Sequence, residues 1–396
     1  MPGALEGIKV LDLSRTLAGP FCTMQLADMG ADVIKIEEPT TGDETRQWLP
    51  QWNGISCYYL SINRNKRSIG LNLKMPEALE VVRKLAAKSD VLIESFRTGG
   101  AESLGFGYED IKRINPRIIY CAVSGYGRTG PLKDKPGYDL MVQAYGGLMS
   151  TTGNPGEPPV RTGYSLVDTI CGLVAYGGIL TALYQREETG RGQYVESSLL
   201  EGQVAVSAFL AVATLGVGIK PGPMGSAHPS LVPYQAFPTR DGYLLLGVNN
   251  DGLWQRFCKA AKRLDLLDSS RFKTNKLRVE NRSLLVPIIE EMFRQKSTKE
   301  WMDLLDEAGI PNSPINDVPT LLEDPQVKFR KMIADVPHPE IPDLRMPASP
   351  IRLSESPATV RSYPPRLGEH TDEVLRELSY SRQAIASMRK SGAVGP

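Results

Sequence analysis

Hydrophobic and polar positions in the first half of the chain alternate between the strand period and the helix period. Five short β-rich runs follow one another, at residues 7–14, 31–37, 67–73, 90–96 and 117–125. A helical pattern joins the first two runs, with Pro20 near its start and Gly30 after its end. A second helical pattern covers 76–88. Strands that alternate with helices predict an α/β fold with a large, doubly wound, mostly parallel, Rossmann-like sheet.

The pattern changes after residue 199. An apolar helix leads into a segment rich in Gly and Pro, and FPTRDGYLLLGV, residues 237–248, then predicts a hairpin that turns at Asp241-Gly242. Helical patterns follow at 250–263, 278–296, 298–308 and 318–332. Residues 336–366 carry eight prolines, which predicts an extended strap before a last helix at 371–389.

Three regions are therefore expected. Residues 1–215 form the large α/β domain, 233–330 a smaller α+β domain, and 331–396 the strap and a C-terminal helix returning to the large domain.

Composition narrows the function classes. The 396 residues are 41% hydrophobic and 23% charged, with a net charge of +1, which favours neither nucleic-acid binding nor a membrane surface. No signal peptide and no apolar stretch of membrane-spanning length without turn signals is evident. The five cysteines are odd in number and widely spaced, which indicates reduced thiols of an intracellular protein. We expect a cytoplasmic location, or the mitochondrial matrix if a presequence was removed.

Several common catalytic motifs are missing. The first strand-to-helix turn, SRTLAGP, has no GxGxxG, and GxxxxGK[ST] and GxSxG do not occur. The three histidines, His228, His338 and His370, show no metal-binding spacing. We expect no metal and no tightly bound cofactor.

Asp168 is a lone acid in the apolar stretch YSLVDTICG, residues 164–172. With Ser165 it has the S-x-x-D spacing of a capping box, so it could simply begin a helix. In the same place the helix dipole would keep the carboxylate ionised, and an ionised carboxylate can act as a nucleophile toward an acyl group. Glycines on both sides, at 163, 172, 177 and 178, would let a ligand come close.

Other polar segments have two interpretations each. The loop SGYGRTGPLKDKPGYD, 124–139, follows a predicted strand and is either a flexible surface loop or a ligand loop. GPMGSAHP, 222–229, is either a linker or a mobile lid. Five basic residues near strand ends are either solvated charges or phosphate ligands: Arg64, Lys66, Arg67, Lys74 and Arg97.

An ordered series of motifs resembles the class III coenzyme A transferases from about residue 5 to 392. They are LDLSRTLAGPFCTMQLADMGADVIKIEEP, GDETR, NRNKRSIGLNLK, DVLIESFRTG, SGYGRTGP, PGYD, VDTICG, TGRGQYVESSLLEG and PPRLGEHTDEVL. YYLSINRNK and HPSLVPYQAF look closest to the succinyl-CoA-dependent dicarboxylate transferases of the succinyl-CoA:glutarate type.

The resemblance implies that Asp168 is the catalytic nucleophile, which forms a mixed anhydride and then an aspartyl-CoA thioester. It implies an acyl-CoA and a carboxylic acid as substrates, and an interlocked homodimer. The implied CoA-binding residues are Leu71, Asn72, Leu73, Lys74, Ser95, Phe96 and Arg97. The residues expected at the substrate or its oxyanion are Leu17, Ala18, Gly19, Tyr138, Gly222 and Gly225. Arg15, Arg46 and Arg161 are candidates for a distal carboxylate of the acceptor.

The chain departs from the family pattern at three positions. Glu38 replaces an Arg and Ser95 replaces an Asn of the formyl-CoA transferases, which puts those CoA contacts in doubt. Leu17 replaces the Gln of oxalate-specific members, which argues against oxalate as the acceptor.

Two alternatives stay open. One is an α-methylacyl-CoA racemase, which would need a His where this chain has Tyr138. The other is a non-catalytic CoA-binding subunit.

Overall fold

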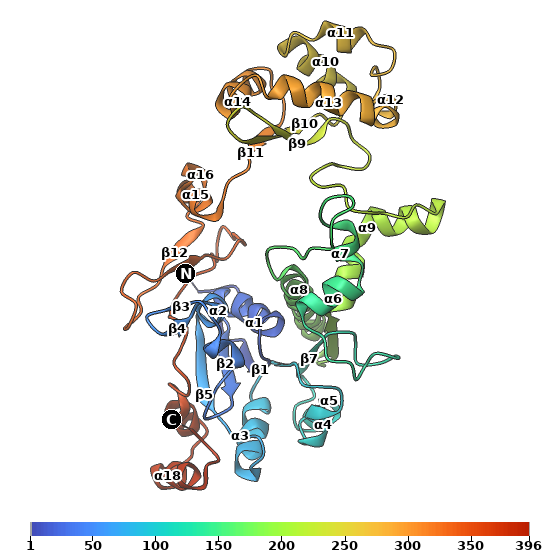
Figure 1. The fold of residues 1–396 in the computed structure, drawn as a ribbon. Coiled ribbons are helices and arrows are strands. Elements are labelled where there is room, and N and C mark those ends of the chain that lie inside the picture. Colours follow the sequence, from blue (N-terminus) through green and yellow to red (C-terminus); the bar gives the residue numbers. More distant parts are fainter. Residues whose placement is uncertain (1, 396) are drawn as a thin grey trace. The chain divides into compact units, whose positions relative to one another are not determined.

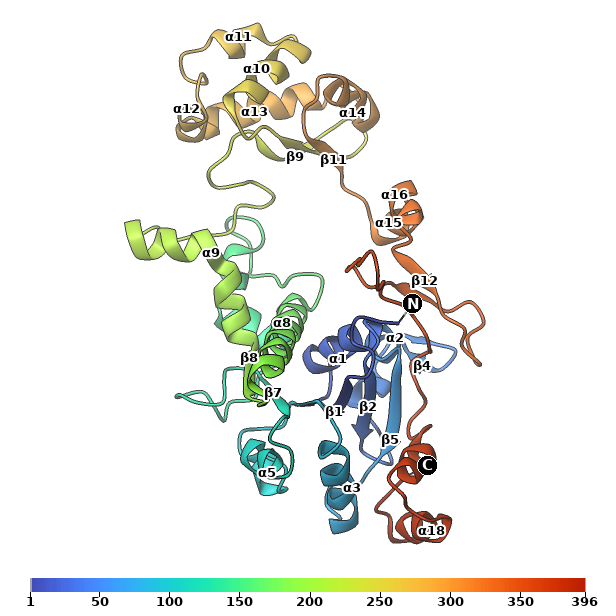
Figure 2. The same cartoon turned by 180° about the vertical axis from the view of Figure 1, so that it is seen from behind.

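The computed structural model describes residues 2–395, which fold into two compact units (Figures 1 and 2). The first unit contains the chain up to Leu148, residues Arg161–Ile219 and the chain from Pro325 on. The second unit contains residues Met149–Val160 and Lys220–Asp324.

A six-stranded parallel sheet forms the centre of the first unit. Its strands are β1 (Lys9–Leu13), β2 (Asp32–Glu37), β5 (Lys66–Gly70), β6 (Val91–Glu94), β7 (Ile119–Ser124) and β8 (Tyr194–Ser198). They are ordered β5-β2-β1-β6-β7-β8, with registers such as Val10 opposite Val33 and Val91. The chain thus winds outward from β1 in one direction and from β6 in the other, which confirms the doubly wound, Rossmann-like sheet.

Each face of this sheet is covered by helices, because alternate side chains of a strand point to opposite faces. On one face, Val10, Ile93 and Cys121 lie in a core with α1 (Ala18–Asp28) and α8 (Leu166–Thr189). On the other face, Leu11, Leu92 and Tyr120 pack with α3 (Pro76–Ala86) and α5 (Tyr108–Ile114), and with α17 (Thr371–Glu377) and α18 (Arg382–Ser391) from the end of the chain.

The predicted final helix is in fact two helices. Ser379, between α17 and α18, has a left-handed φ of 66°, which a continuous helix does not allow. Leu71 then pairs with Val394 in an antiparallel bridge, so the end of the chain extends the edge of the large sheet next to β5.

The second unit has a core of its own. Its sheet contains the predicted hairpin, β9 (Tyr234–Pro238) and β10 (Tyr243–Gly247), and β11 (Asn312–Pro314) beside β10. Its helices are α10 (Asp251–Ala260), α11 (Leu264–Asp268), α12 (Asn275–Glu280), α13 (Arg282–Phe293), α14 (Thr298–Glu307) and α15 (Val318–Glu323).

The remaining elements are short, apart from α9. They are η1 (Glu44–Gln47), β3 (Gln51–Trp52), β4 (Ile55–Ser56), α2 (Cys57–Ile62), α4 (Gly100–Ser103), α6 (Asp139–Tyr145), α7 (Leu148–Thr151), α9 (Leu199–Val217), α16 (Pro325–Phe329), β12 (Ile333–Asp335) and β13 (Arg345–Pro347). The segment predicted as a strap thus contains only the strand β13, which pairs with β12 just before it.

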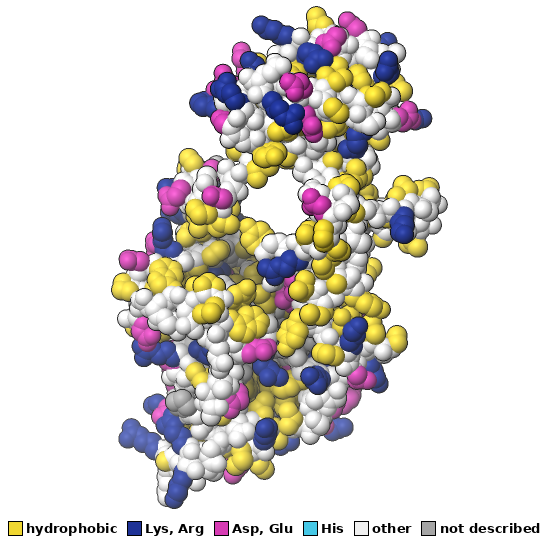
Figure 3. All heavy atoms as spheres, in the orientation of Figure 1, with side chains coloured by type: hydrophobic (Ala, Val, Ile, Leu, Met, Phe, Trp, Pro, Cys, Tyr) yellow, Lys and Arg dark blue, Asp and Glu magenta, His cyan; other side chains and the backbone are white. Residues whose placement is uncertain are grey.

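Two helices, α8 and α9, are long and apolar enough to cross a membrane by length and composition, which differs from the expectation that no such stretch is present. The core helix of a soluble protein meets the same test, and α8 buries Val167, Cys171 and Ala175 in the core. Helix α9 differs, because Val212, Leu215 and Val217 near its C-terminal end are exposed. Figure 3 shows hydrophobic side chains on the projecting end of this helix.

Candidate functional site

A cavity of about 300 Å³ lies where β1, β6 and β7 end, at the point where the strand order reverses. Ligands of doubly wound folds bind at this place. Its lining residues are Arg15, Thr16, Leu17, Ala18, Gly19, Glu44, Ser95, Phe96, Arg97, Thr98, Val123, Ser124, Gly125, Tyr126, Gly127, Arg128, Lys133, Asp134, Lys135, Pro136, Gly137, Tyr138, Asp168 and Leu199.

Asp168 reaches this cavity from the first turn of α8. One turn later, Gly172 lies against α1: a Cβ atom there would be 2.6 Å from the carbonyl oxygen of Ala18. Glycine therefore lets the two helices approach, and this close contact holds Asp168 next to the start of α1.

The expected capping box is wrong. Ser165 occupies the N-cap position of α8, but its side chain makes no capping hydrogen bond. The cap comes instead from Asp139, whose Oδ1 accepts hydrogen bonds from the backbone N–H groups of Val167 at 2.9 Å and Asp168 at 3.2 Å. Gln143 donates to the other oxygen of Asp139 and accepts from the N–H of Thr162, so the capping carboxylate is itself fixed.

Asp168 does not have the low pKa expected from the helix dipole. Burial, followed by the negative charge of Asp139, raises its pKa to about 7. Among the described residues no cation forms an ion pair with it and no donor bonds its side chain. A carboxylate with a pKa near neutrality is more basic, and hence more nucleophilic, than an exposed Asp.

Arg128 ties together two loops that line the cavity. Its guanidinium lies 2.8 Å from Glu94 at the end of β6 and also donates to the carbonyl oxygens of Phe96 and Val123. Burial raises the pKa of Glu94 to about 7, although Arg128 opposes this shift. The sequence marked the 124–139 loop but gave no sign that its arginine would pair with Glu94.

Several residues predicted from the sequence meet at the cavity. Nine of the predicted positions line it: Arg15, Leu17, Ala18, Gly19, Ser95, Phe96, Arg97, Tyr138 and Asp168. Lys133 and Lys135, from the 124–139 loop, also line it, although the sequence did not single them out.

Other predicted residues lie elsewhere. Leu71, Asn72, Leu73 and Lys74 follow β5 and are not among the lining residues, with Leu71 buried and Asn72 bonded to the end of the chain. Gly222 and Gly225 belong to the second unit. The roles given to these six residues stay predictions.

Three basic residues considered for phosphate binding are engaged within the protein. The Arg64 guanidinium forms a buried pair with Asp28, and the Lys66 ammonium forms one with Asp12. Arg67 pairs with Asp32 and with two glutamates of α17. The phosphate interpretation is wrong for Arg64 and Lys66, because both cations are buried and already have acidic partners. For Arg67, whose side chain is partly exposed, it stays a prediction.

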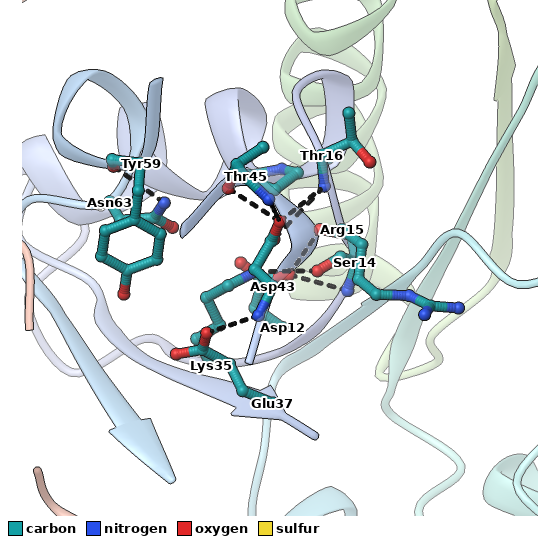
Figure 4. Close-up of polar contacts among 12 residues, drawn as sticks. Asp12, Ser14, Arg15, Thr16, Lys35, Glu37, Asp43, Thr45, Tyr59 and Asn63 are labelled. Atoms are coloured by element: carbon teal, nitrogen blue, oxygen red, sulfur yellow. Dashed lines mark hydrogen bonds and ion pairs between the residues drawn. The ribbon is translucent and has the colours of Figure 1, made fainter. Parts of the chain in front are cut away.

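Lys66 belongs to a buried polar cluster beside the cavity, which Figure 4 shows in part. Its acids are Asp12, Glu37 and Asp43, and its cations are Lys35, Arg46 and Lys66. Arg46 was a candidate for the acceptor's carboxylate; it instead bonds both oxygens of Glu37 and the hydroxyl of Tyr59, and it does not line the cavity.

No group of three or more His, Cys, Asp or Glu side chains suited to a metal ion occurs within residues 2–395. The five cysteines are free thiols, and burial raises the pKa of Cys171, which lies one turn beyond Asp168, to about 12. Asp168 is therefore the group best suited to nucleophilic chemistry in this cavity.

A Rossmann-like sheet whose switch-point cavity contains a half-buried carboxylate defines an α/β protein built for ligand chemistry at the ends of its strands. The chain belongs to the CoA-transferase family III, whose family model matches residues 5–371.

Individual relatives agree with this family. The chain is 42% identical to the succinyl-CoA:glutarate CoA-transferase of Homo sapiens, over 98% of this chain and 90% of that protein. It is 38% identical to the succinate–glutarate CoA-transferase of Agrobacterium fabrum, over 94% and 95% of the two chains. The crystal structure of a CAIB/BAIF family protein from Brucella suis superposes with a TM-score of 0.85 at 38% identity, covering 96% of this chain and all of that one.

Proposed function

We propose that this CoA-transferase moves CoA from succinyl-CoA to a dicarboxylic acid, with Asp168 as the nucleophile. The observation that carries the proposal is the position of Asp168, whose carboxylate lies in the switch-point cavity without a cation to neutralise it. The names of the relatives at 42% and 38% identity support the donor and the class of acceptor.

The reaction is two acyl exchanges on one carboxylate. A carboxylate oxygen of Asp168 attacks the thioester carbonyl of succinyl-CoA, the C–S bond breaks, and a mixed anhydride and the CoA thiolate result. The thiolate then attacks the Asp168 side of the anhydride, which releases succinate and leaves an aspartyl-CoA thioester. The acceptor carboxylate repeats these steps in reverse, so Asp168 is regenerated and the new acyl-CoA departs.

Each tetrahedral intermediate needs donors for its oxyanion. Ala18 and Gly19 are the first two residues of α1 and both line the cavity. Because the first N–H groups of a helix have no partner within the helix, these two are suited to that task. Tyr138, a half-exposed side chain on the opposite loop, would lie against the reacting acyl group.

Arg15 is the candidate that the structure favours for the distal carboxylate of a dicarboxylate. It is exposed and lines the same cavity as Asp168, whereas Arg46 is engaged with Glu37 and Arg161 lies outside the cavity. We expect Arg15→Gln to raise the KM for a dicarboxylic acceptor about tenfold or more, since a charged hydrogen bond would be lost.

Steady-state kinetics with dicarboxylic and monocarboxylic acceptors tests this role. The KM for a monocarboxylic acid should change little in Arg15→Gln, and Arg161→Gln is the matched control in which both constants stay near those of the wild type. An unchanged dicarboxylate KM in Arg15→Gln would rule this arginine out.

The overall proposal is tested by measuring CoA exchange between succinyl-CoA and a panel of acids. We expect exchange with dicarboxylic acids. Rapid solvent-deuterium uptake at the α-carbon of a 2-methylacyl-CoA without any CoA exchange would instead establish the racemase alternative, and CoA binding without either reaction would establish the non-catalytic one.

We also propose that the enzyme is a homodimer, interlocked as the family resemblance implies. Val212, Leu215 and Val217 support this, because these large apolar side chains are exposed together on α9 and a partner would bury them. The cytoplasmic location stays a prediction.

A further inference from the structure

Thr16, in the turn between β1 and α1, has an unusual backbone conformation. Its φ is 71°, in the left-handed region, where a β-branched side chain clashes with its own backbone. It is the only β-branched residue with a positive φ in the described part of the chain. Strained conformations of this kind persist only where surrounding contacts impose them, and they are common at functional sites.

Asp43 and Glu44 supply those contacts. The N–H of Thr16 donates to the carboxylate of Asp43, at 3.2 Å to Oδ2 and 3.4 Å to Oδ1 (Figure 4). The hydroxyl of Thr16 donates to Glu44 Oε1 at 2.7 Å. Both the backbone and the side chain of this one residue are therefore held by the segment that follows β2.

Lys35 on β2 holds both Asp43 and Ser14, the residue at which the turn begins. Its Nζ lies 3.0 Å from Asp43 Oδ2 and donates at 2.8 Å to the carbonyl oxygen of Ser14, and both side chains of the ion pair are fully buried. One buried ammonium thus holds Ser14 directly and Thr16 through Asp43. Asp43 is also bound by the N–H and hydroxyl of Thr45, so its position does not depend on the turn.

The turn contributes directly to the cavity. Arg15, Thr16, Leu17 and Ala18 all line it, and the N–H of Arg15 donates to Ser95 Oγ on the loop after β6. A change of φ at Thr16 would redirect the Arg15 side chain and the N–H groups that begin α1. Buried ionic contacts of this kind often fix one conformation rather than add stability.

We propose that Asp43, clamped by Lys35, is a positioning residue that holds Thr16 left-handed and thereby aims Arg15 and the start of α1 at Asp168. It touches no substrate. This positioning role of Asp43 rests on the proposed CoA transfer only where it is tested by kinetics, because the position of the turn can be measured without any reaction.

A double-mutant cycle with Thr16→Gly tests the role. Glycine adopts a positive φ without strain, so the turn of the Thr16→Gly variant needs no anchor. We expect Asp43→Ala to lower kcat/KM for CoA exchange about 10- to 100-fold, as small misplacements of reacting groups do. In the Thr16→Gly background, Asp43→Ala should lower kcat/KM by a factor at least about five times smaller, because the two residues act on one conformation.

The melting temperature separates positioning from stability. Asp43→Ala should lower it equally in both backgrounds, since Lys35 loses its partner in each. Asp28→Asn is the matched control: it breaks the buried pair with Arg64 at the far end of α1, and it should lower the melting temperature while kcat/KM stays within about twofold of the wild type. Should Asp43→Ala not fold, Asp43→Asn, which keeps the shape and one acceptor, enters the same cycle.

Amide hydrogen exchange at residues 15–18 measures how often the backbone of the turn opens, and it needs no substrate. We expect Asp43→Ala or Asp43→Asn to speed exchange there, while exchange at α8 stays unchanged. The proposal is overturned if the factors by which the Asp43 and Thr16 substitutions lower kcat/KM simply multiply in the double variant. It is also overturned if amide hydrogen exchange in the turn is the same in the Asp43 variants as in the wild type. Wild-type protein without CoA exchange would refute the proposed function alone, because the exchange experiment still reports on the turn.

Discussion

Asp139 acts on the carboxylate of Asp168 at the start of α8 in two ways. Asp139 caps the helix through its Oδ1, and its negative charge adds to the effect of burial on Asp168, whose pKa is raised to about 7. The cap that orients Asp168, the proposed nucleophile, thus also makes it more basic. Both effects come from a residue that makes no covalent bond in the reaction.

This arrangement predicts how activity depends on pH. Asp168 must be ionised to attack, so kcat/KM should rise with pH through about 7 and level off above it. Asp139→Asn keeps an oxygen for the cap but removes the like charge, so the pKa of Asp168 falls and the acidic limb moves to lower pH by about half a unit or more.

A pH–rate profile of the variant measures this shift. Asp134→Asn is the control, because Asp134 lines the cavity but does not contribute to the pKa of Asp168. An acidic limb at the same pH in Asp139→Asn and the wild type would show that Asp139 acts only as a cap.

The sequence predicted the helices and strands that a local pattern of apolar residues marks. The five strands at 7–14, 31–37, 67–73, 90–96 and 117–125 are present as β1, β2, β5, β6 and β7, because their apolar runs are buried on both faces of a parallel sheet. The strand β8 was missed, since its sequence YVESS is mostly polar and lies at the edge.

Contacts between distant residues could not be predicted. The cap of α8 comes from Asp139, 29 residues away from Asp168, and no local spacing marks such a pair. The same holds for Arg128 with Glu94 and for Asp43 with Thr16, because the fold alone brings these segments together. Asp168 could be singled out as a candidate, since a lone charge in an apolar helix needs an explanation.

The packing of α8 on α1 makes a prediction for two glycines of one helix. Gly172→Ala places a Cβ 2.6 Å from the Ala18 carbonyl oxygen, so the helices must separate, at a cost of about 1–3 kcal/mol and a loss of activity. Gly177→Ala meets no atom within 4 Å and should stabilise the helix by about 0.5–1 kcal/mol.

Urea denaturation and CoA-exchange rates of the two variants measure these effects. Equal stability of Gly172→Ala and Gly177→Ala would contradict the close packing that we assign to the start of α8.

The exposed apolar end of α9 predicts that two chains assemble. Leu215 is 87% exposed and Val212 69% exposed, and large apolar surfaces of this kind mark contacts with a partner. We expect wild-type protein to have twice the chain mass of 43.5 kDa in solution, and Val212→Glu with Leu215→Glu to weaken that dimer.

Sedimentation at micromolar concentrations distinguishes the two states. Leu264→Glu, at an exposed leucine of the second unit, is the control and should leave the mass unchanged. A wild-type protein that sediments as a single chain would contradict the proposed dimer.

The proposed mechanism requires that Asp168 carries the CoA covalently. Its most direct test is to incubate the enzyme with succinyl-CoA, trap the thioester with hydroxylamine and locate the modified residue by mass spectrometry, with Asp168→Ala treated in parallel. We predict a hydroxamate at Asp168 in the wild type, and neither a hydroxamate nor CoA exchange in the variant. A mark on another residue, or exchange that persists in Asp168→Ala, would contradict the mechanism.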